Sequence, residues 1–269
     1  MRSHSISIRG LSYILAFLFI ILIYLFQIQA YNILFILLLI LLLSVAFFLE
    51  ENRLFSWTIL AYIFSQFIFL YGDRLILNLQ WTREWEIIGS RLLLFFPILM
   101  IGGLSLKFKR PISIFPFKTN WNQAISLPFQ ARKIHFLFFY FIIIFIIGMC
   151  FLPFLLHLSE PLHLYGFSMV LLLSFINSLL EEGLWRGILL TRLSSIMDQR
   201  SAMIFSCLGY GLTHLSLGYS IVACLLFSIE GLILSFLTVK SRSLIPAIIA
   251  HSLFNVLMIL SGKIPFWIS

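Results

Sequence analysis

Charged residues are scarce in this sequence. They make up 10% of its 269 residues, against about 25% in an ordinary soluble domain. Apolar residues account for 61%, and apolar runs long enough to span a bilayer recur along the whole chain. The regular alternation of apolar and polar positions that marks a membrane β-strand is missing. These shortages exclude a soluble domain and a membrane β-barrel, so the sequence predicts an all-α membrane protein.

Cysteine is scarce as well. Cys150, Cys207 and Cys224 all fall within apolar runs at unrelated spacings, which argues against a disulfide framework or a cysteine-based zinc site. The chain has 18 Lys and Arg residues against 10 Asp and Glu, but no basic patch alternates with exposed aromatic residues. Nucleic acid is therefore not an expected partner. The cations lie instead in short loops between apolar runs, as in a protein that crosses the bilayer repeatedly.

The apolar runs predict a polytopic helical bundle of about eight or nine transmembrane helices. Placing the N-terminus in the cytoplasm leaves most Lys and Arg residues in cytoplasmic loops and only Arg74, Arg83 and Lys263 outside. The first run is expected to remain as a helix, because residues 28–30 lack the small-x-small pattern of a signal-peptide cleavage site. The predicted spans cover residues 11–28, 33–49, 54–71, 87–106, 134–156, 167–190, 201–217, 220–239 and 244–260.

The two halves of the chain differ in where their polar residues lie. Residues 1–160 are predicted to form a scaffold of transmembrane helices with a basic, proline-punctuated cytoplasmic segment at 107–133. That segment would attract anionic lipid, or alternatively cradle a substrate near the membrane surface. From Phe167 onward polar residues enter the spans themselves. Residues 161–262 are therefore the predicted catalytic membrane core, with the catalytic residues on the last four spans.

The first motif is a pair of glutamates followed by an arginine inside an apolar run. Glu182 and Arg186 are four residues apart, so a helix would place them side by side as an ion pair. Glu181 falls on a different face, which is polar and could line a small wet cavity. Gly183 and Gly187 form a Gly-x-x-x-Gly step that predicts close helix packing. The polar face comprises Ser174, Asn177, Ser178 and Glu181.

Two further motifs follow on later spans. Tyr210 and His214 are four residues apart, and so are His251 and Asn255, so each pair projects from one helix face. From the 1.5 Å rise per residue, Glu181, His251 and His214 lie about 13, 10 and 20 Å from the cytoplasmic ends of their spans. Structural hydrogen bonding between helices is the alternative role for each motif taken alone. Their consecutive occurrence on membrane spans favours one shared site.

This order of motifs resembles a known family. Glu-Glu-x-x-x-Arg, then an aromatic-x-x-x-His, then His-x-x-x-Asn, is similar to the signature of the CAAX protease and bacteriocin-processing (CPBP) intramembrane proteases, also called the Abi/CAAX amino-terminal protease family. The resemblance covers residues 167–260. Trp185 and Tyr210 stand where the family usually has Phe, so the aromatic character is kept. The resemblance implies an intramembrane endopeptidase.

The chemistry needs a water, a base and a stabiliser for the oxyanion. A carboxylate in an apolar cavity gains proton affinity, which suits Glu181 to act as general base, with His214 helping to hold and polarise the water. His251 and Asn255 would donate hydrogen bonds to the oxyanion, worth roughly 3–4 kcal/mol per donor. The family resemblance implies a similar division of roles.

Two other aspects of the site stay open. Glu182 and Arg186 would orient the helix and tune the site. Glu181, His214 and His251 would also make a two-histidine, one-glutamate set that resembles a catalytic zinc site. No His-Glu-x-x-His helix is present, so we expect a metal-free mechanism with no cofactor, and zinc is the alternative.

Two charged residues within spans have no place in these motifs. Glu230 lies mid-span with no cationic partner evident in the sequence, and no role is assigned to it. Arg91, near the start of its span, is expected to snorkel toward the membrane surface. Glu230 would be either protonated or directed into the cavity, and Arg91 is not predicted to act in catalysis.

The expected protein is thus a multi-pass enzyme of a bacterial plasma membrane. Its expected partners are the lipid bilayer and a membrane-associated peptide or protein substrate. The alternatives are a non-catalytic bacteriocin-immunity or membrane scaffold protein and a small transporter. A pure binder would not need the complete Glu/His/His/Asn set, and no inverted repeat supports a transporter.

Overall fold

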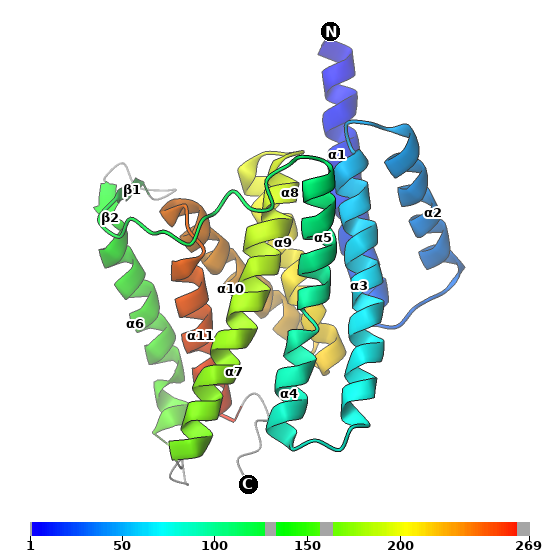
Figure 1. Ribbon diagram of the computed structural model, residues 1–269. Coiled ribbons are helices and arrows are strands. Elements are labelled where there is room, and N and C mark those ends of the chain that lie inside the picture. The colour runs from blue at the N-terminus through cyan, green and yellow to red at the C-terminus, as the bar shows by residue number, and fades with distance from the viewer. Residues whose placement is uncertain (1, 127–132, 157–163, 263–269) are drawn as a thin grey trace.

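The computed structural model describes residues 2–126, 133–156 and 164–262, so Lys263 lies outside the described residues. The chain forms a bundle of helices with one small hairpin (Figure 1). The first helices are α1 (Arg2–Gln27), α2 (Ile33–Phe48), α3 (Arg53–Leu77), α4 (Arg83–Leu92) and α5 (Phe95–Lys107). Strands β1 (Ala124–Ser126) and β2 (Lys133–His135) follow. The later elements are α6 (Phe136–Leu155), α7 (Leu164–Glu182), η1 (Gly183–Leu189), α8 (Leu190–Ser194), α9 (Gln199–Leu212), η2 (Thr213–Leu217), α10 (Ile221–Ser241) and α11 (Ile245–Leu260).

The prediction of an all-α membrane bundle is confirmed. Within the described ranges, six helical segments are long and apolar enough to cross a membrane, and α2 and α11 are shorter apolar helices. The bundle also turns large apolar side chains outward: Phe138, Phe141 and Phe145 of α6 are 62%, 60% and 68% exposed. An apolar outer surface of this extent is suited to lipid. The long apolar segments are Gly10–Gln27, Arg53–Leu77, Arg83–Lys107, Phe136–Leu155, Gly166–Ser194 and Ile221–Ser241.

The predicted span at 201–217 is divided between α9, of 14 residues, and the 3-10 segment η2, and it is not among the helices long and apolar enough to cross a membrane. Helix α9 packs against α1, α8 and α10, and its residues Ala202, Phe205 and Cys207 are buried. Its closest approach is to α10 at Gly211, where a Cβ atom would overlap the Ser228 hydroxyl and the Cys224 carbonyl oxygen. Glycine at this position therefore lets the two helices meet.

The close packing predicted through the Gly-x-x-x-Gly step is wrong. A Cβ atom added at Gly183 would have its nearest neighbour at 4.0 Å, and one at Gly187 would have its nearest at 3.4 Å. Both are ordinary van der Waals distances, so neither glycine is required by a neighbouring helix. Helix α5 does pack against η1, but the nearest neighbours of the two glycines are the side chains of Ile98 and Leu244 and not a helix backbone.

Two further predicted spans are interrupted. The span at 87–106 breaks at Leu93 and Leu94, between α4 and α5. The span at 167–190 passes through a π-helical segment, η1, in which the Leu190 N–H donates to the Trp185 carbonyl five residues earlier. Single π-turns of this kind are often found at functional sites, and η1 carries Arg186.

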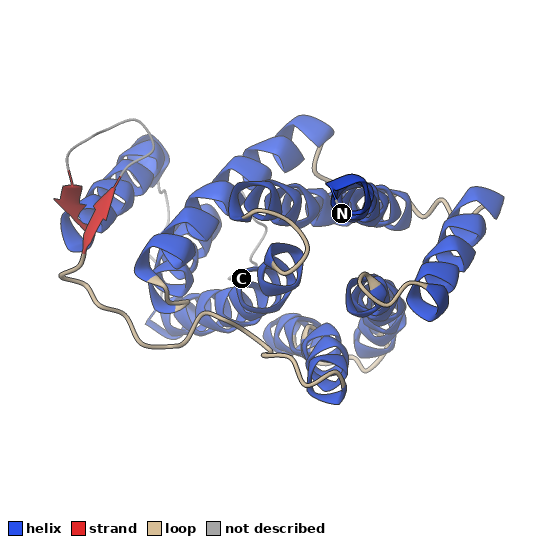
Figure 2. Cartoon of the chain, turned by 90° about the horizontal axis from the view of Figure 1, so that it is seen from above, coloured by secondary structure: helices blue, strands red, loops and turns tan. Residues whose placement is uncertain are grey.

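The basic segment between α5 and α6 lies across one end of the bundle, which we call the basic end. It is tied down by hydrogen bonds from Ile114 N–H to Thr191 Oγ1 (3.2 Å) and from Thr119 to Ser243 (2.8 Å). Its last part forms the antiparallel β1–β2 pair, which the sequence did not predict. From above, this hairpin lies at one edge of the bundle and α2 lies at the opposite edge (Figure 2).

Candidate active site

The two glutamates at the end of α7 lie in different surroundings. Glu182 is fully buried, and its Oε1 accepts from Arg186 Nη1 at 2.8 Å and from His251 Nδ1 at 2.7 Å. The Glu181 side chain is 14% exposed and lines a cavity, with its Oε2 3.6 Å from His251 Nε2. The structure therefore has the expected Glu182–Arg186 ion pair and leaves Glu181 open to the cavity.

Arg186 is buried, and its guanidinium contacts an acceptor on α10 and an aromatic ring on α9 as well as Glu182. Its Nη2 donates to the Gly231 carbonyl at 3.1 Å, and its Cζ lies 4.4 Å from the centre of the Tyr210 ring. A Cβ atom at Gly231 would come within 2.9 Å of the Tyr210 ring and 3.1 Å of Arg186 Nη2. A guanidinium bonds in several directions at once, so Arg186 links α7, α9 and α10 beneath the two glutamates.

His214 lies on η2, where the chain leaves α9. Its Nδ1 is 3.2 Å from the Tyr210 carbonyl oxygen. A carbonyl can only accept, so Nδ1 carries a hydrogen, and in the neutral ring Nε2 is left as an acceptor. The ring stacks on Phe227 with centroids 4.1 Å apart. These two contacts hold the imidazole in one orientation.

The third motif brings α11 to the same place. His251 is buried, and its Nε2 lies 3.4 Å from the Tyr210 hydroxyl. Asn255 donates through Nδ2 to Ser178 Oγ at 3.1 Å. An amide nitrogen carries two hydrogens, so one N–H of Asn255 is held by Ser178 and the other stays available.

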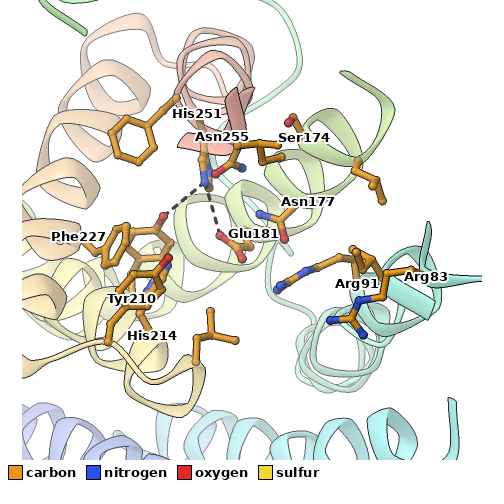
Figure 3. Close-up of a pocket in the computed structure, with 16 residues that line it drawn as sticks. Arg83, Arg91, Ser174, Asn177, Glu181, Tyr210, His214, Phe227, His251 and Asn255 are labelled. Carbon is orange, nitrogen blue, oxygen red and sulfur yellow. Dashed lines mark hydrogen bonds and ion pairs between the residues drawn. The ribbon is translucent and has the colours of Figure 1, made fainter. Parts of the chain in front are cut away.

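A cavity of about 280 Å³ joins these groups (Figure 3). It extends from Glu181 toward Arg83 and Tyr219, at the end of the bundle away from the basic end. Because the helix that carries Glu181 continues to Ser194, Glu181 lies about 20 Å from its basic end, deeper than the predicted 13 Å. The polar residues that line the cavity are Arg83, Arg91, Ser174, Asn177, Glu181, Tyr210, His214, Tyr219, His251 and Asn255.

Comparison with known proteins finds a family similarity over about a third of the chain, the part that carries the three motifs. Residues 163–257 match the family model of Rce1-like proteins, described as type II CAAX prenyl endopeptidase Rce1-like. Over these residues the chain is similar to the Rce1-like family, and we call residues 163–257 the Rce1-like segment. No curated protein and no solved structure matches the chain.

The match confirms the resemblance read from the motifs. All three motifs, from Glu181 to Asn255, fall within the Rce1-like segment, which supports an intramembrane protease. The match begins after α6, so α1 to α6 lie outside it. Arg83 and Arg91 of α4 therefore reach the cavity of the Rce1-like segment from the other half of the chain.

Sequence reasoning missed the contribution of Glu230. The Tyr210 hydroxyl donates to Glu230 Oε2 at 3.1 Å, and the same hydroxyl lies 3.4 Å from His251 Nε2. Glu230 thus belongs to the site through a tyrosine that stands where the CPBP family usually has Phe. The signal was present in Glu230, a mid-span carboxylate with no cationic partner evident in the sequence.

The alternative zinc set does not fit the site as it is arranged. In the described part of the chain, no group of three or more His, Cys, Asp or Glu side chains is placed to hold a metal ion. Both nitrogens of His251 already face polar partners, Nδ1 toward Glu182 and Nε2 toward Tyr210 and Glu181.

Proposed function

We propose that this chain is an intramembrane endopeptidase of the CPBP type. The observation that carries the proposal is the single cavity onto which Glu181, His214, His251 and Asn255 converge from three parts of the Rce1-like segment. Residues 161–262 would be the catalytic membrane core, and residues 1–160 its scaffold. The substrate would be a membrane-associated peptide or protein, and the enzyme would lie in the lipid bilayer of a bacterial plasma membrane.

Water activation is assigned to Glu181 and His214. Glu181 presents a carboxylate to the cavity, and the Nε2 atom of neutral His214 is an acceptor because Nδ1 is held by a carbonyl. A water between the two would donate one hydrogen to each. As the water oxygen attacks the peptide carbonyl carbon, its proton passes to Glu181. The same carboxyl group then gives a proton to the departing amine, which completes hydrolysis.

Oxyanion stabilisation is assigned to His251 and Asn255. The free N–H of Asn255 and the Nε2 side of His251 face the cavity that Glu181 lines. Because Glu182 accepts the Nδ1–H of His251, donation from Nε2 requires the imidazolium form, in which both nitrogens carry a hydrogen. The oxyanion role therefore assigns that form to His251, beside the carboxylates of Glu181 and Glu182. Each donor placed at a developing oxyanion is worth about 3–4 kcal/mol of barrier. Ser178 holds the Asn255 amide in place at 3.1 Å, so little reorganisation is needed when the oxyanion forms.

Glu182 and Arg186 are assigned as positioning residues. Glu182 accepts from His251 Nδ1, so its carboxylate favours a hydrogen on that nitrogen and fixes the imidazole ring. Arg186 compensates the buried charge of Glu182. Neither group faces the cavity. In this assignment the mechanism needs no metal, so hydrolysis should continue after exhaustive chelation.

The experiment compares the membrane peptides of cells that carry wild-type protein, Glu181→Gln or Glu50→Gln. Glu50→Gln is the matched control, because the Glu50 side chain is 85% exposed and lies far along the chain from the cavity. Uncleaved precursors should accumulate with Glu181→Gln and not with Glu50→Gln. His214→Ala should give the same accumulation. If the peptides are identical in all strains while the proteins are present at equal levels, the chain is a non-catalytic immunity or scaffold protein.

A further inference from the structure

Helix α4 presents a stripe of three residues to the cavity. Arg83, Ile87 and Arg91 are spaced by four, so they share one helix face, and all three line the cavity that holds Glu181. Figure 3 shows the two arginines together on the α4 side, across from Asn177 and Glu181. Arg91 also lines an adjoining cavity of about 210 Å³ that shares Glu181 and His214. Arg91 therefore stands where two cavities meet beside the proposed base.

Arg91 differs from the neighbouring arginines in having no counterion. Arg83 is paired with Glu86 at 3.1 Å, and Arg186 with Glu182 at 2.8 Å. Over the residues that the structure describes, the Arg91 guanidinium makes no ion pair and no hydrogen bond. It is nevertheless half-buried, about 12 Å along α4 from Arg83, within the segment Arg83–Lys107 that is apolar enough to cross a membrane. An intramembrane charge of this kind is normally paired or functional.

Two simpler roles do not account for this placement. A snorkelling arginine would turn its guanidinium to the membrane surface, whereas Arg91 lines the cavity beside Glu181 and His214. An arginine in the last turn of a helix complements the carbonyl end of the helix dipole, and Arg91 does stand in the last turn of α4. That role explains the position along α4, but it does not require the side chain to line a cavity.

The opposite wall of the cavity has unused polar atoms as well. Ser174 Oγ and Asn177 Oδ1 are buried and have no hydrogen-bond partner in the described structure, and both residues line the cavity. Hydroxyl and amide oxygens can accept from the backbone N–H groups of a bound peptide. The cavity thus offers acceptors along the α7 wall and an unpaired guanidinium on the α4 wall.

From this arrangement we propose that Arg91 is a specificity-determining residue that binds a carboxylate of the substrate peptide within a few residues of the scissile bond. A guanidinium binds a carboxylate through two parallel hydrogen bonds. The carboxylate supplies the counterion that Arg91 lacks, and the apolar walls favour the pair over the separated charges. The proposal rests on the proposed function only in taking the cavity as the peptide site.

The test measures binding rather than cleavage. The probes are Leu-Ile-Leu peptides with an N-terminal fluorophore, one with a free C-terminal carboxylate and one with a C-terminal amide. A second pair, Leu-Asp-Leu amide and Leu-Asn-Leu amide, distinguishes a side-chain carboxylate from the terminal one. Fluorescence anisotropy is read with the full chain in nanodiscs of uncharged lipid, and empty nanodiscs give the background. Each variant must show the wild-type helical circular dichroism.

Wild-type protein should bind one carboxylate probe at least about tenfold more tightly than its neutral partner. Arg91→Gln should abolish that ratio by weakening only the carboxylate probe, and Arg91→Lys should retain part of it. Arg74→Gln is the matched control, since Arg74 lies on α3 toward the same end of the bundle and lines neither cavity. Its ratio should equal that of wild type. Whichever probe pair shows the Arg91-dependent ratio identifies the terminal or the side-chain carboxylate as the ligand.

Three results would overturn the proposal. The first is that wild-type protein does not distinguish acid from neutral probes in either pair, and the second is that Arg91→Gln weakens the binding of acid and neutral probes equally. Thirdly, the discrimination could persist in Arg91→Gln. If Arg91→Gln does not fold, Arg91→Lys is the test variant. A lysine ammonium cannot form the two parallel hydrogen bonds of a guanidinium, so Arg91→Lys must lower the ratio of carboxylate to neutral probe affinity. The same affinity ratio is measured in Glu181→Gln, where no cleavage is expected. The test of Arg91 therefore does not depend on whether the proposed hydrolysis occurs.

Discussion

Removing the Glu182 carboxylate should destabilise the protein strongly. In Glu182→Ala the Arg186 guanidinium, which is 1% exposed, loses its 2.8 Å partner, and His251 loses the acceptor at Nδ1. Breaking a buried ion pair on one side costs about 3–5 kcal/mol, because the remaining charge is left uncompensated in a medium of low polarity. The hydrogen bond from Arg186 to Gly231 at 3.1 Å offsets only part of this cost.

The double variant Glu182→Leu, Arg186→Met distinguishes the contribution of the ion pair to stability from its contribution to cleavage. Replacing both members of a buried pair by apolar residues of similar volume is often neutral for stability. The double variant should therefore unfold closer to wild type than Glu182→Ala does, while still failing to cleave, because His251 is no longer held. Equilibrium unfolding in mixed micelles, followed by far-ultraviolet circular dichroism, measures the stabilities. A loss below about 1 kcal/mol in Glu182→Ala, the value of an exposed pair, would refute this reasoning.

Three further substitutions each test one contact. Tyr210→Phe removes the hydroxyl between Glu230 and the histidine of α11 and should lower kcat about tenfold with KM unchanged; an unchanged kcat would show that the hydroxyl is dispensable. Gly211→Ala forces a methyl group into α10 and should cost about 1–3 kcal/mol in the same unfolding assay, with Gly103→Ala, where space is open, as control. Hydrogen bonds from Ser201 and Tyr13 lower the pKa of Asp198 to about 2 from 3.8, so its carboxylate stabilises the fold above pH 3.8 and ceases to do so as the pH falls through about 2. The unfolding midpoints of wild type and Asp198→Asn should differ above that window and converge within it.

The sequence was sufficient for features that depend on helical periodicity. Apolar runs predicted the membrane helices, and a spacing of four predicted the Glu182–Arg186 pair that the structure contains. The polar face with Ser174, Asn177 and Glu181 was also predicted, and it lines the cavity. These properties are set within one helix, where neighbours along the chain determine which side chains share a face.

Features that depend on contacts between helices could not be predicted in the same way. The π-turn of η1 and the helix break after Leu92 change the register within spans that read as continuous apolar runs. The Gly-x-x-x-Gly step suggested a close contact at Gly183, but the tight approach is at Gly211, because only the packing of α9 on α10 decides which glycine meets a neighbour.

Two of the charged residues at the site also could not be placed from the sequence, because their positions depend on contacts between helices. Arg91 was expected to snorkel, and Glu230 had no assigned role. Arg91 reaches the cavity because α4 packs against α7, and Glu230 joins the site because α10 packs against α9. Both charges were unusual for their spans, and an unpaired intramembrane charge was the available signal.

The central claim is that Glu181 activates water for peptide hydrolysis. The direct measurement is cleavage of the accumulated precursor by purified protein in isotopically labelled water, with mass spectrometry of the new carboxyl group. Wild-type protein should place one labelled oxygen in that group during cleavage, and Glu181→Gln should produce no cleaved peptide while binding the precursor with unchanged affinity. Labelled product formed by Glu181→Gln at the wild-type rate would contradict the account.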